Sequence, residues 1–255
     1  MSDRVSSPVI AQQLQHRSVR RFLDTPVTDA QLEAIIGAAQ RASTSSNQQV
    51  WSVIAVRDAD RKRRISEAIG SHHYVEHAPV LLVWIADLAR SEELIRSQGV
   101  EPEALDYMEV TLLAALDTGI AAQNALLAAE SLGFGGLFIG GIRNNPEVVI
   151  AELGLPQRVF PVVGMALGVP DPAEGTGIKP RLPLSGVLHR ETYDPERWRE
   201  ATAEYENSYR DYFETQGVPN RSWARTVAGR LGPVSGLHGR HVMRDVLRGQ
   251  GFESK

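Results

Sequence analysis

The sequence predicts an α+β protein in which helices cover a central sheet. Apolar, β-branched runs of strand length and longer runs with helical spacing are both present. They follow one another without the strict alternation that a parallel βαβ fold requires. The chain has 255 residues, of which 42% are hydrophobic and 23% charged, so it is long enough to bury one substantial core. We therefore expect a single domain that spans residues 1–255.

The first half of the chain contains two predicted helices and two predicted strands. Residues 28–41 have helical spacing of apolar side chains and begin with Thr28, a good N-cap. Residues 50–56 (VWSVIAV) predict a strand, and residues 61–69 predict a helix that ends at the following glycine. Residues 79–86 (PVLLVWIA) are apolar throughout, which is typical of a central strand buried on both faces.

A long Ala- and Leu-rich run over residues 103–132 predicts the longest helix. Its apolar residues lie on more than one face, so we expect it to be buried in the core or against a partner chain. Three acidic residues at its start are expected to interact with the helix dipole rather than to act as catalytic acids. They are Glu101, Glu103 and Asp106.

The second half of the chain contains shorter elements. Residues 137–139 and 162–167 predict two further strands, and residues 170–183 form a loop rich in proline and glycine. From residue 193 onward the pattern is helical but more polar. This part has few apolar residues for a core of its own, so residues 193–255 are predicted to form a C-terminal helical arm.

Composition excludes several kinds of site. The chain has no cysteine, which excludes disulfides, iron–sulfur clusters and thiol nucleophiles. Its seven histidines lack the spacing of metal-ligand motifs, and no G-x-S-x-G motif occurs, so we expect no metal ion and no serine nucleophile. No apolar run approaches the roughly 20 residues that span a bilayer, and no signal peptide is recognisable. We expect a cytoplasmic protein without membrane association.

Charge is distributed unevenly along the chain. The net charge of −4 argues against nucleic-acid binding by bulk charge. Residues 219–255 nevertheless contain seven Lys or Arg residues and only two acidic ones. A basic tail of this kind indicates either an anionic ligand at that end or a solvated amphipathic helix, and the charge pattern is compatible with both.

Four short segments have residue types that suit a flat, anionic ligand. HRSVRRF (16–22) and KPR (179–181) supply cations and a hydroxyl for a phosphate, or are charges of the solvated surface. STSSNQQ (43–49) supplies hydroxyls and amides for a ring or a polyol, or forms a capped turn. GFGGLFIGG (133–141) has glycines next to a strand, where the backbone approaches a ligand closely. It is neither a dinucleotide fingerprint nor a P-loop.

In order and spacing, these segments resemble the nitroreductase superfamily of FMN-dependent NAD(P)H oxidoreductases, especially its oxygen-insensitive NADPH nitroreductases and flavin reductases. The matching text is HRSVRRF, STSSNQQVW (43–51), AAQNALLAAESLGFGGLFIGGIRNN (121–145) and KPRLP (179–183). The similarity extends from about residue 10 to residue 193 and continues more loosely to HGRHVMRDVLRGQGF (238–252).

The resemblance implies an intertwined homodimer of α+β subunits with a central mixed sheet, and FMN bound at the interface. The long helix would form much of that interface. Cations would surround the FMN phosphate and ribityl chain, and the backbone of residues 139–141 would lie near the flavin N5. The expected FMN contacts are His16, Arg17, Ser18, Arg20, His72, Ile139, Gly140, Gly141, Lys179 and Arg181, with Thr44, Ser45 and Asn47 of the partner subunit.

The resemblance also implies the activity. FMN would accept hydride from NADPH and reduce a nitroaromatic, a quinone or a similar flat acceptor, with ping-pong kinetics and no catalytic side chain. The expected NADPH or substrate contacts are Ser46, Arg221, Arg225 and Arg240. Three other interpretations stay open: a flavin reductase that releases reduced FMN, a flavin-binding protein without turnover, and a polyanion-binding module.

Two positions depart from the family pattern. His72 stands where the relatives usually have glutamine near the flavin, so either a titratable group lies near the ring or this is a surface histidine. Asn47 and Gln48 stand where close relatives place larger apolar residues. The substrate preference of the relatives therefore does not transfer to this chain.

Overall fold

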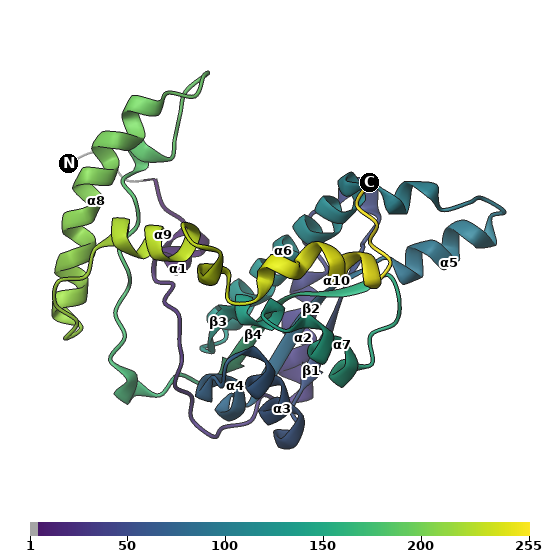
Figure 1. Ribbon diagram of the computed structural model, residues 1–255. Coiled ribbons are helices and arrows are strands. Elements are labelled where there is room, and N and C mark those ends of the chain that lie inside the picture. The colour runs from purple at the N-terminus through teal and green to yellow at the C-terminus, as the bar shows by residue number, and fades with distance from the viewer. Residues whose placement is uncertain (1–4) are drawn as a thin grey trace. The chain divides into compact units, whose positions relative to one another are not determined.

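The computed structural model describes residues 5–255 (Figure 1). The chain divides into two compact units. The first contains the residues up to Glu174 together with Gly239–Lys255, and the second contains Gly175–His238. The C-terminal residues thus belong to the first unit, and the arm boundary placed at residue 193 does not coincide with a boundary between the units.

Four strands form one sheet in the first unit, in the order β1-β2-β4-β3. They are β1 (Trp51–Val56), β2 (Val80–Asp87), β3 (Gly135–Ile139) and β4 (Val159–Gly168). All three strand pairings are antiparallel. Within the described residues, parallel pairing is limited to an isolated bridge between Ser18 and Gly136. The α+β class is confirmed. The expectation of a mixed sheet is wrong for the four strands of this chain, which pair only in antiparallel fashion.

The connections between strands explain these directions. β1 leads to β2 through α3 (Ala59–Ile69) and the short α4 (His73–His77), and β3 leads to β4 through α7 (Pro146–Leu153). When a connection leaves and re-enters the sheet at the same end, the two strands that it joins run antiparallel. By contrast, α6 (Met108–Ser131) is about 36 Å long. It crosses the sheet from β2 to β3, which run in the same direction but are separated by β4.

The core lies on both sides of β2. Alternate residues of this strand belong to two hydrophobic clusters: Leu82 packs with α2 (Asp29–Ala39) and α6, whereas Val83 packs with α3 and α7. All residues of β2 except the last are buried. Helices therefore cover both faces of the sheet (Figure 1), and the prediction of a central strand buried on both faces is confirmed.

Local signals located α2 and α3, the two helices predicted in the first half of the chain. Before α2, the Thr28 hydroxyl accepts from the Gln31 N–H at 3.2 Å, and the Gln31 side chain accepts from the Thr28 N–H at 3.0 Å, which is a capping box. α3 ends at Gly70, which has a φ of 114°. The remaining helices of this unit are α1 (Pro8–Leu14), α5 (Ala89–Ser97) and α10 (Met243–Gly249).

The longest helix begins later than the sequence predicts. Glu103–Asp106 form a separate 3-10 turn, Tyr107 is extended (φ −94°, ψ 148°), and α6 starts at Met108. The cause is the C-terminus of the chain. The Lys255 N–H donates to the carbonyl of Asp106 at 2.8 Å, and the Met108 N–H donates to the carbonyl of Lys255 at 3.2 Å.

The acidic residues before α6 consequently have other partners than the helix dipole. Asp106 forms ion pairs with Arg158 (2.8 Å) and Lys255 (2.9 Å), and Glu101 forms one with Arg96 (3.0 Å). The acidic residue in the first turn of α6 is Glu109. The prediction that Glu101, Glu103 and Asp106 stand at the start of this helix is therefore wrong.

By length and composition, α6 is the one helix in the described part of the chain that is apolar enough to cross a membrane. The core helix of a globular protein passes the same test. Five alanines of α6 are fully buried in the first unit: Ala114, Ala121, Ala122, Ala125 and Ala129. One face of α6 is therefore part of the protein core.

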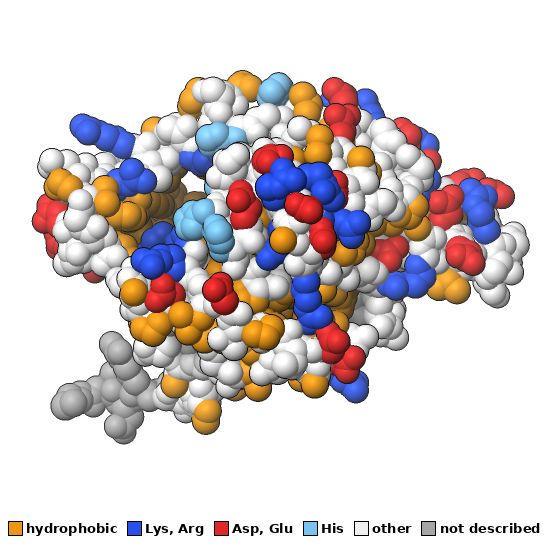
Figure 2. All heavy atoms as spheres, turned by 90° about the horizontal axis from the view of Figure 1, so that it is seen from below, with side chains coloured by type: hydrophobic (Ala, Val, Ile, Leu, Met, Phe, Trp, Pro, Cys, Tyr) orange, Lys and Arg blue, Asp and Glu red, His pale blue; other side chains and the backbone are white. Residues whose placement is uncertain are grey.

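Charges on the helices below the sheet are paired. Arg61 and Arg64 of α3 both contact the carboxylate of Glu152 on α7, at 3.2 and 2.7 Å. Figure 2, seen from below the view of Figure 1, shows basic and acidic side chains interspersed on this face. Such a surface lacks the single-sign field that binds polyanions.

The second unit contains α8 (Pro195–Thr215) and α9 (Trp223–Leu231). Aromatic contacts join them: Tyr205 packs edge-on against Trp223 with ring centroids 5.2 Å apart. The Tyr205 hydroxyl also donates to the carbonyl of Pro180 at 3.0 Å. A few large rings thus supply much of the apolar packing in a segment with little aliphatic content.

Candidate functional site

The segment 16–20 lies beside β3. Ser18 forms its bridge with Gly136, and the Val19 N–H donates to the carbonyl of Gly136 at 3.1 Å. Glycine permits this approach, because a Cβ on Gly135 would lie only 2.5 Å from Cγ2 of Val19. After this bridge the chain turns toward the end of β4, where Phe22 bridges to Pro170 and the Leu23 N–H donates to the carbonyl of Val169 at 2.9 Å.

Carboxylates surround the donors of this segment. Nδ1 of His16 lies 2.5 Å from Oε1 of Glu130 on α6. The Arg17 guanidinium lies 3.4 Å from Glu174, and the Arg20 N–H donates to the same carboxylate at 2.7 Å. The Glu174 side chain is only 6% exposed. Donors from two residues of the segment thus converge on one oxyanion, which is the arrangement that a phosphate also requires.

The turn after β3 contacts residues from distant parts of the chain. The turn is formed by Gly140–Arg143. Arg240 donates from Nε to Oδ1 of Asn144 at 2.8 Å, and Asn144 donates from Nδ2 to the carbonyl of Ile69 at 2.8 Å. A Cβ on Gly140 would lie 3.5 Å from Nη1 of Arg240. The structure therefore brings Arg240 to the turn that begins at Gly140.

His72 lies at the same turn. Its Nε2 is 3.6 Å from the Cβ that Gly141 would carry, and its ring stacks on Tyr74 with centroids 4.9 Å apart. Burial, and to a smaller extent His73, lowers the pKa of His72, so its imidazole is neutral at pH 7. Burial raises the pKa of Tyr74, and the charge of Arg20 opposes that rise.

The loop 43–49 is held on the middle of α6 by a buried carboxylate. The Thr44 hydroxyl donates to Asp117 at 2.5 Å, and the Ser45 N–H donates to its other oxygen at 3.2 Å. Ser46 and Asn47 follow with φ values of 47° and 57°, a region that non-glycine residues rarely adopt. Asp117 thus fixes a turn that exposes Ser46 and Asn47.

Replacing this carboxylate tests its role in the loop. Asp117→Ala is expected to lower the free energy of unfolding by about 2–3 kcal/mol, because hydrogen bonds to a charged group contribute roughly 1.5–3 kcal/mol. Thr44→Val removes the bond to Asp117 and also the hydroxyl that accepts from the Gln49 N–H at 2.9 Å, so it is expected to have an effect of similar size, about 2–3 kcal/mol. Urea denaturation followed by tryptophan fluorescence measures both variants. Unchanged midpoints in both would mean that the loop is held by other contacts.

An exposed apolar stripe runs along α6 beside this loop. Met108, Leu112, Leu116 and Ile120 recur every four residues and are 43, 53, 64 and 44% exposed. The last three line a cavity of about 450 Å³ together with Ser43, Thr44 and Ser45. A contiguous apolar surface of this kind is typical of an interaction site.

The two groups of donors are attached to α6 at different places. Loop 43–49 contacts Asp117, whereas His16 contacts Glu130. Thirteen residues of helix separate these two contacts, which corresponds to about 20 Å along the axis. Segment 16–20 and loop 43–49 therefore do not lie together within one chain.

The remaining predicted contacts belong to the second unit, apart from Arg240. Lys179 and Arg221 flank the ring of Phe213, at 5.9 and 5.4 Å from its centroid. Arg181 donates to the carbonyl of Lys179 at 3.0 Å. Arg225 is exposed in the first turn of α9. The structure thus brings Lys179 and Arg221 to one aromatic ring of α8, and Arg181 contacts the backbone of its own segment.

Sequence reasoning missed three residues that position the predicted ones. Asp117 holds Thr44 and Ser45, Asn144 holds Arg240, and Glu174 faces Arg17. A carboxylate in the middle of an apolar helical run was a usable signal for Asp117, because a buried acid requires donors. For Glu174 no local pattern gives a comparable signal.

Comparison with known proteins places these features in one family. Residues 14–169 match the model of the nitroreductase family, and residues 179–255 match the model of its C-terminal domain. The chain belongs to the nitroreductase family. The resemblance that the sequence motifs indicated is therefore confirmed.

Relatives of this nitroreductase-family chain match over almost its full length. An FMN reductase [NAD(P)H] of Bacillus subtilis is 37% identical over 96% of this chain and 98% of its own length. An oxygen-insensitive NADPH nitroreductase of Salmonella typhimurium is 41% identical over 88% and 91%. The NADPH:FMN oxidoreductase of Vibrio harveyi, solved as a complex with NAD+, superposes with a TM-score of 0.86 at 35% identity, covering 98% of this chain and 100% of that one.

Proposed function

We propose that the protein is an FMN-dependent NADPH oxidoreductase that reduces flat acceptors such as nitroaromatics and quinones. The main structural support is that β3 lies beside the segment 16–20 at Gly136, and that the turn directly after β3 lies beside His72 and Arg240. This arrangement occurs in a chain whose relatives are FMN reductases and an NADPH nitroreductase. The protein is accordingly an oxidoreductase and a flavoprotein.

The residues present fit FMN. The Arg17 guanidinium and the Arg20 N–H already converge on a carboxylate, so they have the chemistry that a phosphate requires. The backbone after β3 has no side chains at two successive positions, which leaves its surface open to a flat ring. The proposed contacts in the first unit are His16, Arg17, Ser18, Arg20, His72, Ile139, Gly140 and Gly141. For Lys179 and Arg181 we propose the phosphate role that the resemblance implies.

We propose a homodimer in which the apolar stripes of two α6 helices meet. The exposure of Leu112, Leu116 and Ile120 supports an interface at this place. The separation of loop 43–49 from segment 16–20 supports it too, because both sets of donors reach one FMN only if the loop comes from a second chain. Thr44, Ser45 and Asn47 are therefore proposed to contact the FMN held by the partner subunit.

The protein's own residues bind and orient rather than react. When bound, FMN supplies the ring that accepts hydride and passes electrons to the acceptor. The guanidinium groups of Arg143 and Arg240 lie beside the Gly140 backbone, where they contribute positive charge. We propose that Arg240 binds the 2′-phosphate of NADPH. Ser46, Arg221 and Arg225 are further candidate contacts of the nucleotide or acceptor.

Truncating Arg240 tests this assignment. Arg240→Ala is expected to raise the KM for NADPH by about tenfold or more, because a charge-assisted hydrogen bond contributes roughly 1.5–3 kcal/mol. The KM for NADH should change little, since NADH lacks the 2′-phosphate. Arg244→Ala, which removes an exposed arginine of α10, is the matched control. Equal effects of Arg240→Ala on both nucleotides would exclude a contact with the 2′-phosphate.

An absorption spectrum tests the proposed function as a whole. The purified protein, reconstituted with FMN and kept anaerobic, should show flavin bands that bleach on addition of NADPH. Bands that stay oxidised would indicate a flavin-binding protein that uses another donor or none. Absence of bound flavin would contradict the proposed function.

A flavin reductase is the second candidate, favoured by the FMN reductases among the relatives. In that case free FMN would act as the acceptor and leave in reduced form. Turnover with free FMN, compared with turnover with a quinone at equal concentration, separates the two activities. A large excess of the first would favour the reductase.

We also propose that the protein acts in the cytoplasm on small molecules, without nucleic-acid or membrane partners. Paired and interspersed charges on the face formed by α3 and α7 support this (Figure 2). So does the burial of one side of α6 in the core. Retardation of nucleic acid at about 0.15 M salt would contradict the proposal.

A further inference from the structure

The C-terminal segment, residues 239–255, is attached to the first unit at both of its ends. It is drawn in yellow in Figure 1 and contains α10. One end carries Arg240, and the other ends at Lys255. How firmly these two ends are held therefore determines where the Arg240 guanidinium lies.

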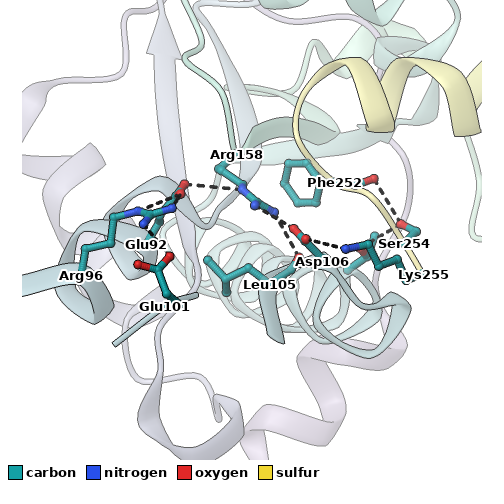
Figure 3. A network of polar contacts seen from close by, with 10 residues as sticks. Glu92, Arg96, Glu101, Leu105, Asp106, Arg158, Phe252, Ser254 and Lys255 are labelled. Carbon is teal, nitrogen blue, oxygen red and sulfur yellow. Dashed lines mark hydrogen bonds and ion pairs between the residues drawn. The ribbon is translucent and has the colours of Figure 1, made fainter. Parts of the chain in front are cut away.

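The far end is held by a network centred on Asp106 (Figure 3). The Asp106 carboxylate accepts from Nζ of Lys255 at 2.9 Å and from Nη2 of Arg158 at 2.8 Å. Two backbone hydrogen bonds add to these, since Lys255 pairs with the peptide groups of Asp106 and Met108. The hydrogen bond from Lys255, and next that from Arg158, lowers the pKa of Asp106. The carboxylate is therefore ionised at neutral pH.

A buried aromatic ring and a contact between two hydroxyls also hold this end of the segment. Phe252 is 1% exposed and meets Phe160 edge-on, with ring centroids 6.2 Å apart. The Ser254 hydroxyl lies 3.1 Å from that of Thr111 on α6. The last residues are thus fixed to α6 and β4.

The near end is held at Asn144. Arg240 donates to Oδ1 of Asn144 at 2.8 Å. Gly239 has a φ of 89°, and a Cβ there would lie 2.7 Å from the carbonyl oxygen of Asn144. The backbone therefore passes so close to this carbonyl that only glycine fits at position 239. This close contact fixes the backbone from which the Arg240 side chain extends.

Between its two ends, α10 packs unevenly: Val246 is buried and the Arg158 N–H donates to the carbonyl of Gln250 at 2.8 Å, but one side of the helix faces a void. A cavity of about 340 Å³ lies beneath it, lined by Met243, Leu247 and Phe252 on one side and by Thr111 and Val162 on the other. Side chains that line a void lose the contacts that otherwise hold a helix in place. The position of α10 therefore depends on three attachments: Asn144 before the helix, Arg158 at Gln250, and Asp106 at Lys255.

We propose that Asp106 is a positioning residue for Arg240: by holding Lys255 it fixes α10, and α10 keeps the Arg240 guanidinium beside the Gly140 backbone for the nucleotide. Asp106 does not touch the site, and it acts through the C-terminal segment. The proposal rests on the proposed function, since it assumes that Arg240 binds NADPH.

Asp106→Asn removes the charge and keeps the shape of the side chain. In the FMN-loaded enzyme we expect the KM for NADPH to rise about five- to tenfold, because a loosened guanidinium loses much of its preorganisation. We expect kcat at saturating NADPH and the Kd for FMN to stay within about twofold. Glu101→Gln is the matched control, because Glu101 pairs with Arg96 in the same region but does not contact the C-terminal segment. It should leave all three values unchanged.

A double-mutant cycle separates positioning from general damage. In an Arg240→Ala background, Asp106→Asn should cause no further rise in the KM for NADPH, because the group it positions is missing. An undiminished effect in that background would overturn the proposal. Lys255→Met, at an exposed position, breaks the same ion pair with less risk to folding. Like Asp106→Asn, it should raise the KM for NADPH.

Amide hydrogen exchange tests the attachment independently of activity. Asp106→Asn and Lys255→Met should speed exchange in α10 and leave α3 unchanged. Unchanged exchange in α10 would overturn the proposal even if the enzyme is an NADPH oxidoreductase. Faster exchange in α10, together with a wild-type protein that does not oxidise NADPH, would instead overturn the proposed function.

Discussion

Replacing both Arg17 and Arg20 by alanine is expected to give a folded but colourless protein. The Arg17 guanidinium and the backbone N–H of Arg20 converge on the carboxylate of Glu174. The guanidinium charges of both residues are proposed to hold the FMN phosphate, and the substitutions remove these charges while keeping the N–H. Each charge-assisted hydrogen bond contributes roughly 1.5–3 kcal/mol. Loss of two such bonds weakens binding by about two to four orders of magnitude. The absorbance ratio of flavin to protein after gel filtration measures the retained FMN.

The same segment offers a matched control for this variant. Arg21 is adjacent, but its side chain is 54% exposed and pairs with Asp171 at 3.0 Å. Arg21→Ala should therefore retain FMN in full. Circular dichroism should show that the Arg17→Ala, Arg20→Ala protein keeps its helical content, because these side chains are not part of the hydrophobic core. Stoichiometric FMN in that variant would mean that the phosphate lies elsewhere.

Leu116→Glu is expected to separate the proposed dimer into monomers. Leu116 is the most exposed residue of the α6 stripe, at 64%. In a twofold interface the same substitution enters from both subunits. Each copy loses the burial of a leucine, about 1.5–3 kcal/mol, and places a charge in an apolar contact. Sedimentation velocity of the purified variant measures the change in mass.

Loss of the dimer should also reduce FMN binding. Thr44, Ser45 and Asn47 are proposed to reach the FMN of the partner subunit, so a monomer retains only part of each site. Val148→Glu on α7 is the control, because Val148 is similarly exposed, at 42%, and lies outside the stripe. It should remain dimeric and bind FMN. A dimeric Leu116→Glu protein with full FMN content would place the interface elsewhere on the molecule.

Sequence periodicity predicted the central elements because the information for them is local. The apolar run at 79–86 became β2, which is buried on both faces. Thr28 and Gly70 mark the ends of α2 and α3 as predicted. A cap or an amphipathic face is determined within about ten residues, so it can be recognised from a short stretch of sequence.

Long-range pairings account for what the sequence analysis did not predict. The start of α6 is set by Lys255. Its backbone pairs with Asp106, just before the helix, and with Met108, the first residue of the helix. Strand direction depends on how far each connecting helix carries the chain, which no single segment encodes. The partners of Asp117 and Glu174 are equally distant in sequence.

By itself, the sequence determined the α+β class, the family and the types of residues available for a phosphate and a flat ring. The order of motifs and the chemistry of residues are properties of the sequence, so they can be recognised without the structure. Only the tertiary structure decided which of these residues share a site. It brought Arg240 to the turn at Gly140, and it placed loop 43–49 about 20 Å along α6 from the contact of His16. Distances between residues far apart in the chain depend on packing and long-range hydrogen bonds, and these exist only in the folded protein.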